Sequence, residues 1–225
     1  MRLTLKVKLG AAFAVVILLA AGGMTAGILN LGSLNGNVEK IVQKDWAKVR
    51  LINEVLDMAN DNGRANFEMI LTDSPVQRNK IKARIARNVS AITAKVDQVE
   101  TMLYDPEGRA RLAAMKEARA PYVASFGEVS KLVEAGLKDE AARLASATMV
   151  PALGEFIGAI DSLVAFQSDL VEASGREAEA AYISARTLML SLLALAIVVA
   201  AAMAVWIVLN ISRAIASALG LANAL

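Results

Sequence analysis

The class of this protein is decided by the stretch LMLSLLALAIVVAAAMAVWIVL, residues 188–209. The stretch lies inside a run from Thr187 to Ser212 that carries no Asp, Glu, Lys or Arg. A second charge-free run, Leu9–Val38, lies near the N-terminus. Each run exceeds the roughly 20 residues that a helix needs to cross the hydrocarbon core of a bilayer. The sequence therefore predicts a membrane protein with two transmembrane helices, at 9–31 and 187–210.

The distribution of charge predicts the orientation of the chain. Three basic residues precede the first run and Arg213 follows the second, whereas all 22 acidic residues lie between Glu39 and Glu179. Because cytoplasmic flanks are enriched in Lys and Arg, residues 1–8 and the C-terminus are expected in the cytoplasm and residues 32–186 outside. A cleaved signal peptide is the alternative for the first run, with small residues at 20–27 as the cleavage region, but its apolar character continues through Leu31.

The middle segment predicts four helices. Pro75 follows the capping residue Ser74, Pro106 follows Asp105, and Gly136 precedes Asp139, so that each pair indicates a turn between two helices. Apolar residues recur at alternating spacings of three and four within the helices, as in Ile85, Val89, Ile92, Val96, Val99 and Leu103. Such spacing is typical of helical bundles. We therefore expect an all-α fold, an antiparallel up-down-up-down four-helix bundle whose first and last helices continue into the two membrane helices.

Several stretches resemble a known family. The segment from Arg64 to Asp73, the turn Asp105–Arg109, the stretch Ala118–Tyr122, and Pro151 with the two residues after it are similar to the four-helix-bundle sensor domain of bacterial methyl-accepting chemotaxis proteins. The resemblance implies a transmembrane chemoreceptor of the bacterial inner membrane, a homodimer with a periplasmic sensor domain that binds a small ligand.

The end of the chain extends the resemblance. Residues 211–225 are similar to the first helix of a HAMP relay domain, although Ala214 stands where such helices usually carry proline. The resemblance implies signalling through the second membrane helix to a HAMP domain, and a longer receptor of which this chain is a fragment.

Arg119 is the first candidate for ligand binding. Counting from Leu112 and Met115 places it on the buried stripe of the third helix, followed by Tyr122. An unpartnered buried guanidinium is costly, so we expect either a carboxylate ligand held by Arg119 and Tyr122 or an ion pair with Glu155 on the fourth helix.

The same counting places Pro121 and Pro151 near one height on adjacent helices. Pro121 and Pro151 each leave a backbone carbonyl free inside a helix, which could open a space between the third and fourth helices. Its expected lining is Asn88, Thr93, Thr148 and Asn60. Arg64 is another candidate for ligand binding, with a solvated surface residue as the alternative. The basic residues at 78, 80, 82, 84 and 87 could attract anions or simply form a soluble face.

Composition argues against other functions. The chain has no His and no Cys and lacks a phosphate-binding loop motif, which argues against an enzyme, a metal site and a cofactor. A net charge of +2 argues against nucleic acid as a partner. Two alternatives remain: the sensor portion of a histidine kinase or cyclase, and a membrane-anchored helical adaptor without a small-molecule ligand.

Overall fold

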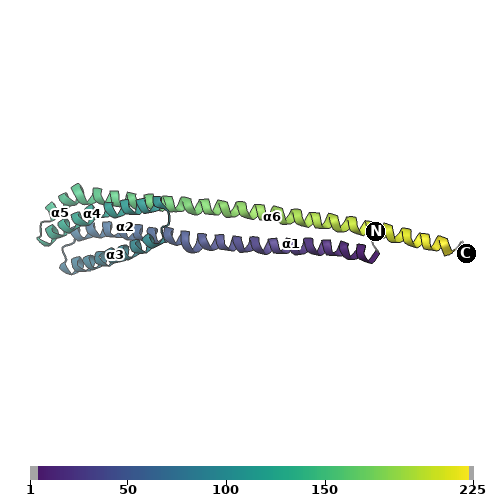
Figure 1. Ribbon diagram of the computed structural model, residues 1–225. Coiled ribbons are helices and arrows are strands. Elements are labelled where there is room, and N and C mark those ends of the chain that lie inside the picture. The colour runs from purple at the N-terminus through teal and green to yellow at the C-terminus, as the bar shows by residue number, and fades with distance from the viewer. Residues whose placement is uncertain (1–4, 223–225) are drawn as a thin grey trace. The chain divides into compact units, whose positions relative to one another are not determined.

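The computed structural model describes residues 5–222, and every regular element within that range is a helix (Figure 1). The contacts divide the chain into two compact units, Glu39–Gly175 and the pair Met1–Val38 with Arg176–Leu225. The predicted cytoplasmic N-terminus and the predicted HAMP helix lie partly outside the described residues, at 1–4 and 223–225.

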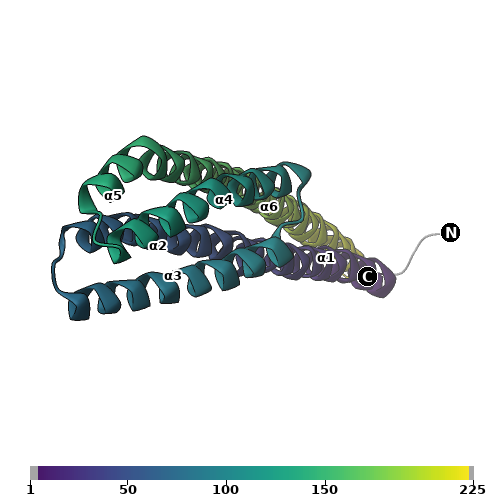
Figure 2. The ribbon, with the colours of Figure 1, turned by 90° about the vertical axis from the view of Figure 1, so that its left-hand side faces the viewer.

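The first unit is a four-helix bundle, as the sequence predicts. Its first rod combines the π-helical segment η1 (Lys40–Asp45) with α2 (Trp46–Leu71), and α3 (Pro75–Met102) and α4 (Pro106–Glu134) form the second and third. The fourth rod combines α5 (Lys138–Leu144), the π-helical segment η2 (Ala145–Met149) and the beginning of α6 (Val150–Ala222). Helix α2 packs along α3, and α4 packs along α5 and η2 (Figure 2).

The turns between the rods lie where the sequence predicts them. The Ser74 hydroxyl accepts a hydrogen bond from the Gln77 amide at 3.3 Å, and Asp105 caps α4 in the same way through the Gly108 amide. Proline at the first helical position completes both caps, because its missing amide proton is not needed there. Gly136 has φ +78°, which favours glycine. Asp139 does not cap the fourth rod: α5 begins at Lys138, and its first turn has no side-chain cap.

The core follows the predicted seams with local exceptions. Met69, Val129, Ile160 and Leu163 are completely buried. On α4 the buried stripe passes through Ser125, whereas Phe126 is only partly buried against the core. Since 3.6 residues per turn do not match a strict repeat of seven, a seam residue can give way to its neighbour along the helix.

A polar layer lies at the end of the bundle that contains the α3–α4 turn. It consists of Asp45, Lys48, Gly108 and Gln167, and we name it the Lys48 layer. Lys48 is 0% exposed, forms an ion pair with Asp45 at 2.9 Å, and lies over the Tyr104 ring at 4.3 Å. Gln167 is 1% exposed, and neither atom of its amide has a hydrogen-bond partner in the described part of the chain. An added Cβ at Gly108 would lie 2.8 Å from Asp105 Oδ1 and 2.9 Å from Gln167 Nε2, so both side chains would have to shift for any larger residue.

The second unit contains α1 (Leu5–Glu39) and the later part of α6. The two helices approach closely at Gly27, where an added Cβ would lie 3.8 Å from Met189. Large apolar side chains such as Leu18, Leu29 and Ile197 are more than half exposed. Within the described residues, two helices are long and apolar enough to cross a membrane, by length and composition. The bounds 9–31 and 187–210 stay predictions.

Candidate functional site

A buried polar contact joins two rods in the middle of the bundle. Asn66 of α2 donates a hydrogen bond from Nδ2 to the Tyr122 hydroxyl of α4 at 2.9 Å. The Tyr122 ring stacks on Phe156 of α6 with its centroid 6.1 Å away. Asn66 is 0% exposed and its Oδ1 has no partner among the described residues. We name Asn66, Tyr122 and Phe156 the Asn66 layer.

Burial also affects the pKa of the Tyr122 hydroxyl. Desolvation raises the pKa of Tyr122, and the hydrogen bond from Asn66 opposes that rise. The hydroxyl is therefore neutral at physiological pH, and it accepts from Asn66 while keeping its own proton for another acceptor.

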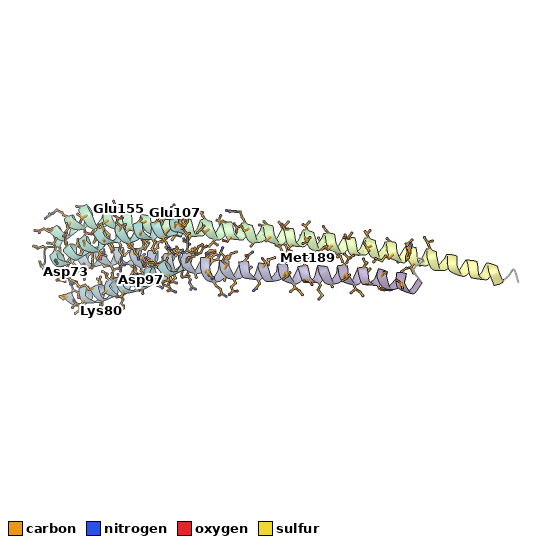
Figure 3. The ribbon with its side chains drawn as sticks, viewed as in Figure 1. Asp73, Lys80, Asp97, Glu107, Glu155 and Met189 are labelled. Carbon is orange, nitrogen blue, oxygen red and sulfur yellow. The ribbon has the colours of Figure 1, made fainter. Side chains whose placement is uncertain are left out.

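Arg119 lies on the α3-facing side of α4. Its Nη2 donates to Thr93 Oγ1 at 3.0 Å and to the Val89 carbonyl at 3.2 Å. The side chain is half-buried rather than in the core, and partial desolvation lowers the pKa of its guanidinium. The expected ion pair with Glu155 is wrong: Glu155 is exposed on α6 (Figure 3), whereas Arg119 reaches α3. No carboxylate of the described residues forms an ion pair with Arg119.

Asn88 joins α3 to α2. Its Nδ2 donates to Asp61 Oδ2 and to Asn62 Oδ1, each at 2.9 Å. Asn62 is 1% exposed, so this contact extends from the surface into the core. The structure thus brings together two predicted residues, Arg119 with Thr93, and places Tyr122 and Asn88 in separate contacts with α2.

Three predicted residues lie outside these contacts. Thr148 lies in η2, and its hydroxyl donates to the Leu144 carbonyl of the same rod. Asn60 likewise donates to the Leu56 carbonyl of its own helix. The Arg64 side chain is 73% exposed and lies 3.8 Å from Asp61. These positions lie on the bundle surface, so the structure does not bring Thr148, Asn60 or Arg64 to Arg119.

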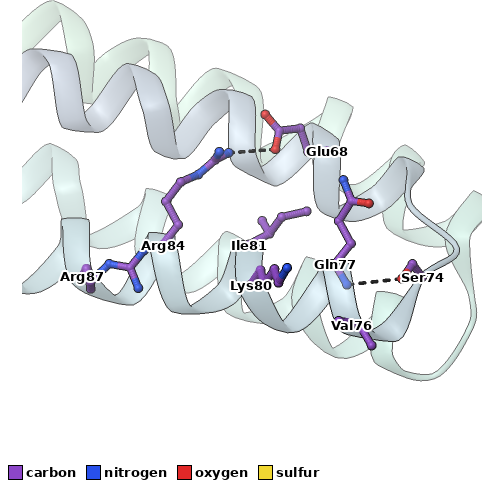
Figure 4. A pocket seen from close by; sticks show the side chains of 8 residues that line it. All are labelled: Glu68, Ser74, Val76, Gln77, Lys80, Ile81, Arg84 and Arg87. Carbon is purple, nitrogen blue, oxygen red and sulfur yellow. Dashed lines mark hydrogen bonds and ion pairs between the residues drawn. The ribbon is translucent and has the colours of Figure 1, made fainter.

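A groove of about 610 Å³ lies between α2 and α3, near the turn that joins them. We name it the α2–α3 groove; Figure 4 shows its lining, which is Glu68, Ser74, Val76, Gln77, Lys80, Ile81, Arg84 and Arg87. Arg84 reaches from α3 to Glu68 of α2, with Nη2 and Oε2 2.9 Å apart. Its Nε also lies 3.5 Å from Asp61 Oδ2. A volume of this size suits a small molecule.

The sequence reasoning missed the residues of α2 that organise these contacts. Asn62 and Asn66 stand at core positions of the repeat, where a buried amide must find a partner on another helix. That signal was present in the sequence. The partners themselves, Asn88 and Tyr122, depend on the rotation of each rod, which spacing alone does not fix.

The comparison with known families agrees with this architecture. Residues 2–182 match the family described as "Four helix bundle sensory module for signal transduction". The match covers most of the chain, which therefore belongs to this family, and it confirms the resemblance to chemotaxis sensor domains. A search of curated proteins found no match.

Proposed function

We propose that this sensory module is the ligand-binding and membrane-spanning part of a bacterial chemoreceptor. In this proposal the chain lies in the inner membrane as a homodimer, and its bundle faces the periplasm. The ligand is a small carboxylate, and the signal passes through the second membrane helix to a HAMP domain.

Arg119 carries the proposal for the ligand. Its guanidinium is half-buried, is held in place by Thr93 and the Val89 carbonyl, and forms no salt bridge with a described carboxylate, although the charge of Asp97 acts on it. A guanidinium fixed by one nitrogen leaves its other donors available for a carboxylate. Thr93 would position the arginine. Tyr122 would couple a movement of α4 to α2 through its hydrogen bond, and Asn88 would do the same for α3.

Helix α6 supports the proposal for the relay. Phe156 and Leu163 pack in the bundle core, and the same helix continues through the apolar stretch at 188–209. A ligand that binds one packing of the bundle more tightly shifts the population toward it by its difference in affinity. A change in the position of α6 would then pass along the helix.

Binding to the whole chain tests the ligand proposal. The chain, purified in lipid nanodiscs, is titrated with single organic acids and amino acids while its thermal unfolding is followed. We expect at least one carboxylate to stabilise the chain, and Arg119→Gln to weaken that ligand about tenfold or more, as the loss of a charged hydrogen bond predicts. Arg143→Gln, at an exposed position of α5, is the control. Unchanged binding in Arg119→Gln would remove Arg119 from the site.

Accessibility tests the orientation. The chain has no cysteine, so Glu100→Cys introduces a single thiol at an exposed position of α3. We expect an impermeant maleimide to label this thiol in cells with a permeabilised outer membrane and an intact inner membrane. Protection until the inner membrane is lysed would contradict a periplasmic bundle.

A further inference from the structure

Helix α3 has an unusual distribution of charge. Between Pro75 and Val96 it carries six basic residues and no Asp or Glu. Like charges three or four residues apart on a helix repel each other and destabilise the helix. Lys80, Arg84 and Arg87 have this spacing, so they lie along one face and raise the positive potential there.

Four of the six basic residues have partners elsewhere in the bundle. Arg78 donates to the Thr72 carbonyl, and Lys82, Arg84 and Lys95 pair with acidic residues of other helices. The exceptions are Lys80 and Arg87, which form no hydrogen bond or ion pair with any other described residue. Both exceptions line the α2–α3 groove.

The α2–α3 groove also has apolar lining residues. Ile81 is 5% exposed and forms part of an apolar wall, and Val76, 67% exposed, adds apolar surface at the open side. Arg84 is held in the middle by Glu68, so its charge is already balanced (Figure 4). Two free cations therefore flank a paired one, with Lys80 and Arg87 about 10 Å apart along the helix axis.

From this arrangement we infer that the α2–α3 groove binds a small organic anion with two or more carboxylates. One carboxylate meets Lys80, another meets Arg87, and the hydrocarbon body lies against Ile81. Arg84 contributes a donor at the centre of the groove. The site is separate from Arg119, which lies on the α4 side of α3, and it stands whether or not Arg119 binds a ligand.

The number of charges determines the expected preference. A monocarboxylate neutralises one of the two free cations and leaves the other unpaired. Citrate and succinate can engage both, and the two contacts reinforce each other because the second forms within one bound molecule. Inorganic phosphate has the charge but no hydrocarbon body, so it should bind more weakly than citrate.

Titration of the full chain tests this inference. The chain is placed in nanodiscs of zwitterionic lipid, and citrate, succinate, acetate and inorganic phosphate are titrated at constant ionic strength by calorimetry. We expect citrate and succinate to bind at least tenfold more tightly than acetate. The double variant Lys80→Gln with Arg87→Gln should weaken citrate at least tenfold.

A second pair of substitutions separates local contacts from net charge. Lys44→Gln with Lys131→Gln removes the same charge from exposed positions outside the groove and should leave citrate affinity unchanged. Equal weakening in this control would overturn the inference, because it would indicate long-range attraction only. No binding of citrate or succinate at millimolar concentration would overturn it as well.

The same titration with Arg119→Gln distinguishes the two sites. If citrate binding survives the groove substitutions and is lost in Arg119→Gln, the groove inference fails and the proposed ligand site stands. If citrate binding is lost only in the variant with Lys80 and Arg87 replaced, the groove is a citrate site that does not depend on Arg119.

Discussion

The Asn66–Tyr122 hydrogen bond is the clearest case of a single contact that specifies the packing of the bundle. It joins side chains 56 positions apart in the sequence, and both residues are buried. A buried amide in an apolar seam is costly unless a partner satisfies it, so the contact favours the one rotation of α2 and α4 that brings the two side chains together.

Removal of the hydroxyl tests this contact. Tyr122→Phe keeps the ring that stacks on Phe156 and leaves Asn66 Nδ2 without its acceptor. An unsatisfied buried donor costs about 1–3 kcal/mol, so the midpoint of thermal unfolding should fall by several degrees. Tyr182→Phe, at a 50% exposed position, should leave the midpoint unchanged. Equal midpoints for wild type and Tyr122→Phe would contradict a stabilising role for this bond.

The same residue predicts a dependence on alkaline pH. Burial raises the pKa of Tyr122 in the folded chain. The unfolded tyrosine loses its proton near pH 10, whereas the folded one keeps it longer, so the stabilisation is complete below about pH 10 and is lost as the pH rises toward the folded value. Unfolding midpoints measured between pH 8 and 11 should therefore decline less steeply in Tyr122→Phe than in wild type. Parallel pH profiles would argue against a buried, neutral phenol.

Single residues also mark where the sequence was insufficient. The spacing predicts Arg119 on the buried stripe of its helix, whereas in the structure its side chain is half-buried and faces α3. A small rotation of the helix is enough to bring the guanidinium to Thr93 of α3 rather than to Glu155, which was one of the two expected partners. Periodicity assigns a residue to a side of a helix, but the choice of a partner depends on a few degrees of rotation that come from packing.

At the scale of the elements, the Lys48 layer is polar where the rest of the core is apolar. Gln167 occupies a core position and has no hydrogen-bond partner among the described residues, so it lowers the stability of the bundle. We therefore expect this level to contribute less to the stability of the bundle than the apolar level of Ile52 and Leu163, one turn away.

Substitution of Gln167 tests that interpretation. Gln167→Met keeps the volume and removes two unsatisfied polar atoms, so we expect a gain of about 1–3 kcal/mol and a higher midpoint of thermal unfolding. Gln98→Met, at an exposed position of α3, serves as the control and should change little. A lower midpoint for Gln167→Met would mean that the amide is hydrogen-bonded in solution by a buried water.

The helices themselves were predictable because their ends carry local signals. Proline after a capping residue marks the beginnings of α3 and α4, and Gly136 marks the turn before α5. The two π-helical segments were not predicted. Only Pro151 indicated one of them: it cannot donate to the Ala147 carbonyl, and η2 contains Ala147.

At the scale of the whole molecule, the two units differ in what surrounds their apolar residues. In the bundle these side chains face one another, whereas in α1 and the later part of α6 most of them are exposed. Exposed apolar helices of this length suit a bilayer. The charge-free runs predict membrane helices at 9–31 and 187–210, and both predicted ranges lie within the second unit.

A disulfide tests the pairing of α1 with α6. An added Cβ at Gly27 would contact Met189 at 3.8 Å, while one at Gly22 would have no atom within 4 Å. The contact at Gly27 is with Sδ and Cε, at the far end of the Met189 side chain, so Gly27→Cys with Met189→Cys should form an intramolecular disulfide faster than a pair at Gly22 on mild oxidation, which changes mobility on a non-reducing gel. Gly22→Cys with Met189→Cys is the matched control and should oxidise more slowly. The reverse result would contradict the observed register of the two helices.

The π-helical segment at Ala145–Met149 has a consequence for engineering and for evolution. Its backbone hydrogen bonds join residues five apart rather than four apart, so this segment of the fourth rod contains one residue more than an α-helix of the same length. Loss of one residue there can be absorbed by rewinding to an ordinary α-helix, and the angular phase of everything downstream is kept. The same deletion within α2 would swing every later side chain on that rod by about 100°. Length variants of this sensory module should therefore be tolerated at the two π-helical segments, η1 and η2, before the α-helical parts of the bundle.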